Sequence, residues 1–447
     1  MSDGQELAML YREHVAAVMA RTESALAATG FDHLVVFAGS ERLRLYDDAP
    51  YPFAVNPQFK AWLPLTSQPD CFLVFTPGST PRLAYYQPDD YWYAPPESPA
   101  GYWPAQFDIT VIKESVEALA MLPDSGRVAI LGEFANEALR PGRGEVNPRG
   151  LLAHLDYQRA WKTRYEIECM RRANATATRA HQAAEAAFRA GGSEYEIHLA
   201  YCAAAGHTEN ELPYSSIVAL NQHGAVLHYQ NWQRTRPAPG ELHSFLIDAG
   251  ASCYGYAADI TRTYSAADAD FQALIDAMDA AQQRLCAMLR PGIDYRDVHL
   301  QAHREVATIL SECGLVKRAA DEVYAQGITR MFFPHGVGHY IGLQVHDVGG
   351  FMGGPDGSIV PKPEGHPFLR LTRILDPGHV MTIEPGLYFI DSLLRELRAS
   401  AHADAVDWKM VDSLRKFGGI RIEDDVAVTE TGYENLTRDQ FRLLQQH

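Results

Sequence analysis

The chain has 447 residues, of which 47% are hydrophobic and 21% charged, and this composition is typical of soluble globular proteins. It exceeds the length that one hydrophobic core usually organises, so we expect two domains. The 39 Lys and Arg residues against 56 Asp and Glu residues give a formal net charge of −17, which argues against a surface for nucleic acid or anionic membranes.

The cysteines and the N-terminal residues indicate the cellular compartment of the protein. The six cysteines lie far apart and form no CxxC pair, which favours free thiols over a disulfide framework. The acidic N-terminal residues lack the basic and apolar regions of a signal peptide. No stretch approaches the roughly 20 uncharged apolar residues that cross a bilayer. We therefore expect a cytoplasmic protein.

The first third of the chain alternates helical and strand-like segments. Apolar residues at helical spacing predict a helix over residues 6–28, and a further helical segment is predicted over about 109–121. The stretch 85–104, dense in Tyr, Trp and Pro, is interpreted as an ordered loop. Apolar runs predict buried strands over 33–39, 71–75 and 127–132. This alternation indicates a small α/β domain.

The composition turns strongly helical after Tyr157, so we place the domain boundary near 155–165 and divide the chain into 1–160 and 161–447. Helices are predicted over about 165–190, 194–206, 268–290 and 296–314. Short strands bounded by Gly and Pro are predicted over 216–220, 244–250, 257–264, 380–390 and 418–428. This pattern indicates an α+β domain with an antiparallel sheet. Gly349–Pro367 is interpreted as a long surface loop.

Two aspartates mark the first chemical signal. Residues 245–263 are interpreted as two apolar strands that fold back around a turn near 253–255. The midpoint between Asp248 and Asp259 falls at that turn, so in a symmetric hairpin their Cβ atoms face each other about 4.5–5.5 Å apart. Two carboxylates that close repel each other and lose hydration, and a bound cation removes both costs. The alternative is that one aspartate merely caps the turn.

Three histidines follow in a Gly-rich segment. His335, His339 and His346 lie among glycines that permit close approach of the backbone. An HExxH zinc helix is excluded, because Gly336 stands in place of the glutamate and the glycines disfavour a helix. Metal binding and acid/base chemistry are the uses expected of such histidines.

Two further acids lie in strand-like context. Glu384 follows an apolar run and precedes a Pro-Gly turn, while Arg421 and Glu423 are two residues apart and hence on one strand face. A salt bridge at a strand edge explains either acid alone but explains the whole set poorly. Four carboxylates and one imidazole suit hard divalent ions, Mn²⁺ above all, and two such ions bridged by carboxylates indicate metal-assisted hydrolysis.

These segments together resemble a known superfamily. The motifs IDAG, ADITRT, HGVGH, TIEPG and GIRIED are similar to those of the pita-bread metallopeptidases. HGVGHYIGLQVHD and residues 46–64 resemble proteobacterial Xaa-Pro dipeptidases (prolidases), including members described as organophosphorus acid anhydrolases. The resemblance implies an α/β N-terminal domain and an α+β pita-bread catalytic domain with an antiparallel sheet. It also implies cleavage of dipeptides that end in proline, with phosphotriester hydrolysis as a side activity.

The resemblance also implies a ligand set for two divalent metal ions per subunit, expected to be Mn²⁺. Asp259 and Glu423 would bridge the two ions, and Glu384 would take the proton of the attacking water. The five ligands implied in this way are Asp248, Asp259, His339, Glu384 and Glu423.

Three more residues are implied to act in catalysis. His346 would stabilise the tetrahedral intermediate or assist the leaving proline nitrogen. Arg421 would pair with Glu423 or with the substrate carboxylate, and His228 would contact the substrate.

The resemblance further implies substrate-binding residues. His335 would line the leaving-group side, and Tyr214 and Tyr295 fall where the family has pocket aromatics, although ordinary core tyrosines fit them equally well. The N-terminal loop of a partner subunit would close the site, with Asp47 or Asp48 next to the substrate ammonium. A homodimer is implied by this arrangement.

Three alternatives stand beside this interpretation. They are a non-catalytic pita-bread binding module, a metal-free amidinohydrolase of the creatinase type, and an Xaa-Pro aminopeptidase that acts on longer peptides. The complete ligand set disfavours the first two alternatives. The loop at 46–53 disfavours the third.

Overall fold

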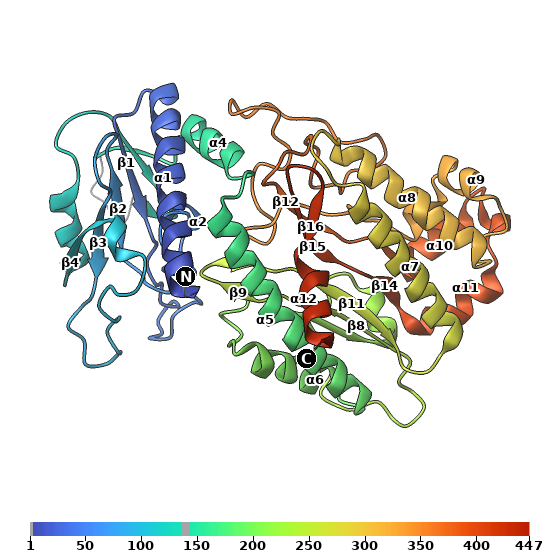
Figure 1. Cartoon of the computed structure of the whole chain (residues 1–447). Helices are drawn as coiled ribbons and strands as arrows, with labels where there is room; N and C mark the ends of the chain where they lie inside the picture. The colour runs from blue at the N-terminus through green and yellow to red at the C-terminus, as the bar shows by residue number, and fades with distance from the viewer. Residues whose placement is uncertain (1–2, 136–142, 447) are drawn as a thin grey trace. The chain divides into compact units, whose positions relative to one another are not determined.

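The computed structural model describes residues 3–135 and 143–446, which fall into two compact units (Figure 1). The first unit comprises 1–168 with the short segment 353–358, and the second comprises 169–352 and 359–447. The structural division thus follows Glu168, whereas the composition changes at about 160. Among the described residues, no helix has the length and apolar character needed to cross a membrane.

The first unit is built on a six-stranded mixed sheet. Its order is β4-β3-β2-β1-β5-β6, and the strands are β1 (His33–Phe37), β2 (Phe72–Phe75), β3 (Arg82–Tyr86), β4 (Asp108–Ile112), β5 (Val128–Leu131) and β6 (Glu145–Val146). The central strand β1 is antiparallel to β2 and parallel to β5. The helices of this unit are α1 (Asp3–Thr29), α2 (Pro57–Lys60) and α4 (Arg149–Gln158). The predicted α/β domain, its long first helix and its three strands are confirmed.

Two predictions in this unit are wrong. Residues 108–112, expected to begin a helix, form β4, which pairs in parallel with β3. Only residues 115–121 are helical, as the 3-10 helix η2 (Ser115–Met121) with a capping box between Glu114 and Glu117. The stretch 85–104 is not loop throughout, since Tyr85 and Tyr86 end β3. Pairing of β3 with β4 overrides the local preference in both places, helical at 109–112 and irregular at 85–86.

The second unit combines helices with small antiparallel sheets. The four predicted helices are confirmed as α5 (Arg164–Arg189, which begins in the first unit), α6 (Glu194–Ala205), α7 (Ala269–Ala287) and α8 (Tyr295–Glu312). Four shorter helices were not predicted: α9 (Ala320–Ala325), α10 (Asp391–Ala399), α11 (Trp408–Leu414) and α12 (Leu436–Gln445).

The strands of the second unit pair antiparallel throughout, as predicted. One sheet has the order β11-β8-β7, a second has the order β12-β15-β16, and β13 pairs with β14. Their bounds are β7 (Ile217–Leu220), β8 (Ser244–Asp248), β11 (Thr261–Ser265), β12 (Val380–Ile383), β13 (Gly386–Tyr388), β14 (Gly419–Arg421), β15 (Asp424–Val428) and β16 (Tyr433–Asn435). Residues 349–367 contain no helix or strand, so the predicted loop is confirmed.

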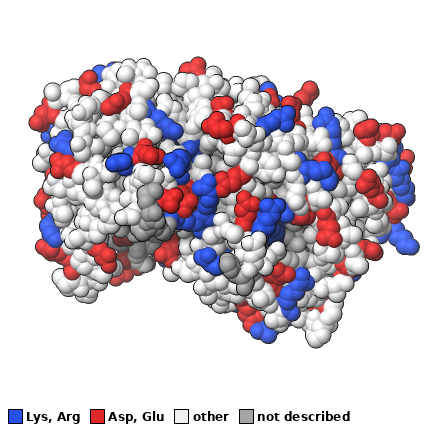
Figure 2. Space-filling model, in the orientation of Figure 1, with Lys and Arg blue, Asp and Glu red and all other residues white. Residues whose placement is uncertain are grey.

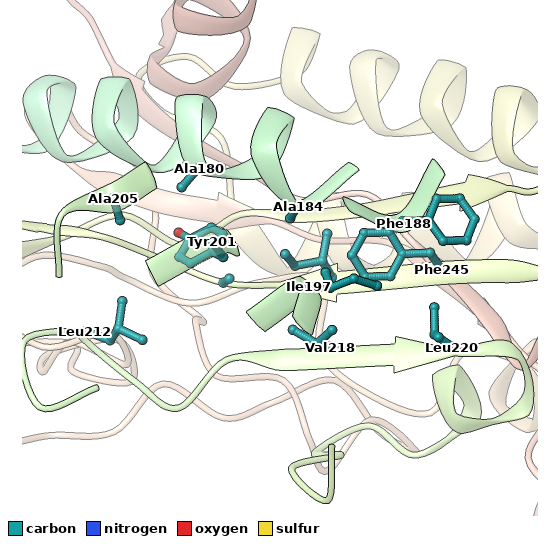
Figure 3. Close-up of a cluster of buried hydrophobic side chains, with 12 residues drawn as sticks. Ala180, Ala184, Phe188, Ile197, Tyr201, Ala205, Leu212, Val218, Leu220 and Phe245 are labelled. Atoms are coloured by element: carbon teal, nitrogen blue, oxygen red, sulfur yellow. The ribbon is translucent and has the colours of Figure 1, made fainter. Parts of the chain in front are cut away.

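A hydrophobic cluster fixes one of these sheets beneath two helices (Figure 3). Ala180, Ala184 and Phe188 recur every four residues on α5 and therefore share one helix face. The ring of Phe188 stacks on Phe245 of β8, with ring centroids 5.1 Å apart. Because β8 ends at Asp248, this core holds the strand that carries the first candidate ligand.

The predicted turn at 253–255 is present, but the predicted register is wrong. Two short strands, β9 (Ser252–Cys253) and β10 (Tyr256–Ala257), flank a two-residue turn, Tyr254-Gly255, in which both residues have positive φ. That is the backbone of a type I′ hairpin turn. It places Asp248 opposite Thr261 rather than opposite Asp259. The register follows from the place of the turn, which is centred between Tyr254 and Gly255 rather than between Cys253 and Tyr254, as a pairing of Asp248 with Asp259 would require.

Charge is mixed over the surface. On the face drawn in Figure 2, Lys and Arg side chains are interspersed with Asp and Glu. Positive charge is therefore not gathered into one continuous patch on that face.

Candidate metal centre

The five candidate ligands all lie in the second unit, and four of them lie at the end of a strand or just beyond it. Asp248 ends β8, and Asp259 lies between β10 and β11. Glu384 directly follows β12, and Glu423 lies between β14 and β15. Side chains at strand ends can converge without disturbing the hydrogen bonds of the sheet, so these positions suit a binding site.

The Gly-rich segment brings His339 to the same place. The amide of Glu384 donates to the Val337 carbonyl at 2.8 Å, and the amide of Thr382 donates to the His339 carbonyl at 2.9 Å. The segment thus lies along the end of β12 like a further strand. A Cβ atom at Gly338 would collide with the Thr382 carbonyl oxygen and the Tyr295 hydroxyl, so only glycine permits this approach.

The donor atoms are close enough to share a cation. One donor atom each from Asp259, His339 and Glu423 lie within 4.8 Å of one another. His339 Nε2 is 3.5 Å from Asp259 Oδ2 and 3.6 Å from Glu384 Oε1. Asp248 adjoins them through Arg421, whose Nη2 donates to Asp248 Oδ2 at 2.5 Å. The structure therefore gathers all five predicted ligands in one cluster.

The cluster carries more negative charge than its own cations offset. Burial, together with the Asp259 and Asp248 carboxylates, raises the pKa of Glu384 to about 7. Burial also raises the pKa of Asp248 to about 6 despite Arg421, and it raises the pKa of Glu423 well above the usual range. Burial lowers the pKa of His339, but the Asp259 and Glu384 carboxylates outweigh it and raise the value to about 9.

One buried oxygen atom that lacks a hydrogen-bond partner among the described residues supports the binding of a metal ion. Asp248 Oδ1 is buried and has no hydrogen-bond partner in the described part of the chain. A buried carboxylate oxygen without a donor is costly unless a cation binds it. Together with the surplus of carboxylates, this atom shows that the donor set fits hard divalent cations.

The Arg421 guanidinium donates hydrogen bonds to three side chains of the protein. Besides Asp248, it donates to Thr261 Oγ1 at 3.0 Å and to the Tyr388 hydroxyl at 2.9 Å, while its Nε is 3.9 Å from Glu423. Thr261 Oγ1 in turn donates to Glu423 Oε2 at 2.6 Å. Thr261 and Tyr388 are functional neighbours that the sequence analysis missed. The alternation of ADITRT along a strand was the signal for Thr261, since its position faces Asp248.

Two of the histidines border the cluster. The His346 ring meets the His339 ring edge to face, with centroids 4.4 Å apart, and burial together with His339 lowers the pKa of His346 to about 4. His335 Nδ1 is 3.6 Å from Glu384 Oε2, while its Nε2 shares a hydrogen bond with the Tyr388 hydroxyl at 2.8 Å. Burial and Arg421 lower the pKa of His335 to about 3, so it is neutral at physiological pH.

The two tyrosines differ in position. The Tyr214 hydroxyl donates to Asp259 Oδ1 at 2.5 Å, so it touches a candidate ligand directly. Tyr295 is fully buried, and its hydroxyl donates to the Thr382 carbonyl at 2.8 Å. Its surroundings match the core alternative rather than a side chain that contacts substrate.

The remaining predicted residues are exposed. His228 lies just after the 3-10 helix η3 (Asn221–Ala225), and its charge acts on the pKa values of both His335 and His346. Asp47 and Asp48 lie in the first unit, within a turn where Asp47 Oδ1 accepts from the Ala49 amide at 3.2 Å.

Comparison with known families matches both parts of the chain. Residues 9–157 match the family described as "Xaa-Pro dipeptidase, N-terminal domain", and residues 168–430 match "Metallopeptidase family M24". Relatives named Xaa-Pro dipeptidase cover nearly the whole chain. The protein from Xanthomonas axonopodis pv. citri is 53% identical over 97% of this chain and 98% of its own length. The protein from Stenotrophomonas maltophilia strain K279a is 52% identical over 98% of each chain.

Solved structures share the fold. Aminopeptidase P from E. coli with the inhibitor Pro-Leu superposes with a TM-score of 0.72 at 27% identity, over 96% of this chain and 95% of that chain. Proline aminopeptidase P II from Yersinia pestis gives a TM-score of 0.71 at 25% identity, over 98% of this chain and 100% of that chain. A further similar structure is zinc-substituted E. coli aminopeptidase P in complex with product, at 26% identity and a TM-score of 0.71, over 96% of this chain and 95% of that chain.

Proposed function

Because the chain belongs to metallopeptidase family M24, we propose that it is a metal-dependent Xaa-Pro dipeptidase, which cleaves the peptide bond before a C-terminal proline. The observation that carries this proposal is identity above 50% to Xaa-Pro dipeptidases across both units. The aminopeptidase P structures share the fold at about half that identity, so cleavage of longer peptides is the weaker alternative.

We propose that the cluster holds two divalent ions, with Mn²⁺ as the preferred species. Oxygen-rich ligation supports this choice of metal. The bound ions would polarise the scissile carbonyl and lower the pKa of the attacking water. The residues proposed to hold them are Asp248, Asp259, His339, Glu384 and Glu423.

The protein's own groups then supply the proton transfers. Glu384, with a pKa near neutrality, can accept a proton from the attacking water and release it later. His346 is neutral above about pH 4, so one ring nitrogen can donate a hydrogen bond to the developing oxyanion or to the leaving proline nitrogen.

Arg421, His335 and His228 are proposed to position rather than to transfer protons. The three hydrogen bonds of Arg421 hold Asp248 and Tyr388 in place. His335 would line the leaving-group side next to Glu384. His228 is exposed and close enough to influence both neighbouring histidines, which suits contact with the substrate.

We propose a homodimer in which residues 1–160 serve dimerisation and closure of the partner's site. In the loop around Asp47 and Asp48, two large apolar side chains are strongly exposed to solvent. Leu45 is 81% exposed and Tyr46 is 99% exposed. Such side chains gain by being covered in an interface. The partner subunit's Asp47 or Asp48 would then bind the free amine of the dipeptide.

Two finer features complete the proposal. The thiols of Cys71, Cys202, Cys286 and Cys313 are free, which supports a cytoplasmic location. Cleavage of organophosphate triesters would be a side activity, because tetrahedral phosphorus resembles the peptide-hydrolysis intermediate.

The proposal is tested by hydrolysis of Gly-Pro and Leu-Pro against Gly-Pro-Ala, using chelator-stripped protein with and without added Mn²⁺. We expect Mn²⁺ to restore cleavage of the two dipeptides and not of the tripeptide. Cleavage of the tripeptide at a comparable kcat/KM would transfer the assignment to an aminopeptidase. No cleavage with any divalent metal would favour a binding module instead.

A further inference from the structure

A second group of histidines lies in the second unit, behind the candidate metal centre. His299 and His303 are four residues apart on α8, hence on one helix face, and His366 reaches them from the loop 349–367. The Phe333 ring lies between this group and the centre, with its centroid 4.8 Å from both the His303 and the His335 rings. None of these three histidines is used by the proposed hydrolysis.

The three imidazoles converge on one point. Their ring centroids are 4.8, 4.7 and 4.6 Å apart, and one ring nitrogen from each lies within 4.8 Å of the others. Imidazole nitrogens on one tetrahedral ion, each about 2.0–2.1 Å from it, are about 3.4 Å apart. The three nitrogens lie within 4.8 Å of one another, and rotation of the rings would bring them to the spacing that a shared ion requires.

The hydrogen bonds within the histidine cluster do not satisfy every buried ring nitrogen. His299 Nε2 and His366 Nδ1 share one hydrogen bond at 2.9 Å. Whichever of them carries the proton, His299 Nδ1 stays buried without a partner in the described residues. Buried polar atoms in a structural network are normally satisfied, so His299 Nδ1 is available to a bound ion or water.

The surroundings of the three histidines favour the binding of a metal ion. His303 Nδ1 shares a hydrogen bond with Thr329 Oγ1 at 2.9 Å, which fixes the ring and leaves Nε2 for a metal. His299 and His303 are each 1% exposed, whereas His366 is half-buried and gives access from solvent. Burial lowers the pKa of His303 to about 3, so the imidazole is in the neutral form that metals bind.

We propose that His299, His303 and His366 form a second metal site, which takes one transition-metal ion, Zn²⁺ in preference to Mn²⁺. Three neutral nitrogen donors favour Zn²⁺, Cu²⁺ or Ni²⁺, whereas the carboxylate-rich centre suits harder ions. The ion would tie the loop 349–367 to α8 and thereby support Phe333, which backs His335. The site is thus a structural clamp, chemically distinct from the catalytic centre.

One nearby charge opposes the binding. The Arg330 guanidinium lowers the pKa of both His303 and His366, and it lies 3.4 Å from the Gly327 carbonyl and 3.5 Å from the Gly365 carbonyl. Its positive charge repels a divalent ion at the cluster. Arg330→Gln is therefore expected to tighten Zn²⁺ binding.

The test measures both metals in the same sample. Purified protein is saturated with Mn²⁺, titrated with Zn²⁺, passed through a desalting column and analysed for Mn²⁺ and Zn²⁺ per chain. We expect one Zn²⁺ to be retained without loss of Mn²⁺. Zinc that only replaces an equal amount of Mn²⁺, or no retained zinc, would overturn the proposal. This outcome does not depend on peptidase activity, so it stays distinct from a failure of the proposed function.

Variants locate the ion. His366→Gln and His303→Gln are expected to weaken Zn²⁺ binding at least about 100-fold, since even the loss of an outer-shell partner costs 10–100-fold. His402→Gln, at a half-buried histidine that precedes the 3-10 helix η5 (Ala403–Ala405), is the matched control and should retain the ion. Cleavage of Gly-Pro by Mn²⁺-loaded His366→Gln should be unchanged. Equal zinc retention in wild-type protein and both cluster variants would contradict the assignment.

Discussion

Glu423 and Asp424 are neighbours in the chain and both are buried, but they lie in opposite electrostatic surroundings. Asp424 accepts from Arg262 at 2.6 Å and from Arg438 at 2.7 Å, and these cations outweigh burial and lower its pKa to about 2. Glu423 has Arg421 only at 3.9 Å, and burial with the surrounding carboxylates raises its pKa well above the usual range.

The difference separates an acid that is paired within the protein from one that is proposed to bind metal. Successive residues of an extended chain point to opposite sides, so one short segment supplies a side chain to each region. On the Asp424 side the protein provides its own cations, and Gln282 and Asn435 complete the hydrogen bonds at 2.9 Å each. On the Glu423 side the charge is left for a cation from solution.

The largest expected effect is on catalysis. Glu384→Gln removes the proposed proton acceptor while keeping the shape of the side chain, so kcat for Gly-Pro should fall by about 10²–10⁴-fold. The measurement is steady-state kinetics at saturating Mn²⁺. Asp424→Asn is the matched variant on the structural side, and any Asp424→Asn protein that remains folded should keep kcat within a few fold. Equal loss of kcat in both variants would break the comparison.

The next effect is on stability, and its sign should differ between the two neighbours. Asp424→Asn leaves two partly buried guanidinium groups without their shared carboxylate, so the free energy of unfolding should fall by about 3–5 kcal/mol. Glu423→Gln in metal-free protein removes a buried negative charge that other carboxylates repel, so stability should stay equal or rise. Urea denaturation of chelator-treated proteins measures both. A large loss in Glu423→Gln would contradict the account.

A pH series sharpens the same contrast. In metal-free protein the pKa of Glu384 is raised to about 7, above its unfolded value, so its protonated form favours the folded state. This contribution is fully present below about pH 4.3 and is lost as the pH rises to about 7. The melting temperature of wild-type protein relative to Glu384→Gln should therefore fall between about pH 4.5 and 7.5. A constant difference across this range would show that Glu384 is not perturbed.

A smaller effect is expected from the residue that supports one ligand. Tyr214→Phe removes the hydrogen bond to Asp259, so Mn²⁺ affinity should weaken about 10–100-fold, while kcat at saturating metal changes little. Calorimetric titration of metal-free protein measures the affinity. Tyr295→Phe provides a comparison, because its hydroxyl bonds only a backbone carbonyl and touches no ligand. The same affinity in wild type and Tyr214→Phe would show that the bond is incidental.

The smallest effect belongs to a charge pair in solvent. Arg442 and Asp439 lie on α12 with side chains 65% and 45% exposed, and their distance is 3.0 Å. Arg442→Ala should change the free energy of unfolding by no more than about 1 kcal/mol, because solvent already compensates both charges. Urea denaturation beside Asp424→Asn measures the contrast. A loss as large as that of Asp424→Asn would mean that burial does not explain the difference.

Much of the fold and of the ligand set could be predicted from sequence because the signals are local. Helical periodicity located α5, α6, α7 and α8, and acids at the ends of apolar runs located four of the candidate ligands. The Gly-rich segment identified His339, because glycine at 338 is required where the backbone passes the Thr382 carbonyl. Each of these signals is visible in residues a few positions apart, although the contact that requires Gly338 is with the distant Thr382.

The rest depended on contacts between distant parts of the chain. Arg421 and Asp248 are separated by 173 positions, so no local pattern predicts their hydrogen bond. The strand at 108–112 forms because β3 offers it a parallel partner. The hairpin register depended on a turn centred between Tyr254 and Gly255, with the tyrosine in the positive-φ conformation usually taken by glycine or asparagine.

The uncompensated carboxylates are proposed to hold two metal ions. Metal-free protein titrated with Mn²⁺, with free Mn²⁺ followed by electron paramagnetic resonance, tests it directly. We expect two Mn²⁺ per chain in wild-type protein and fewer than two in Glu423→Gln. Retention of two ions by Glu423→Gln, or fewer than two in wild-type protein, would contradict it.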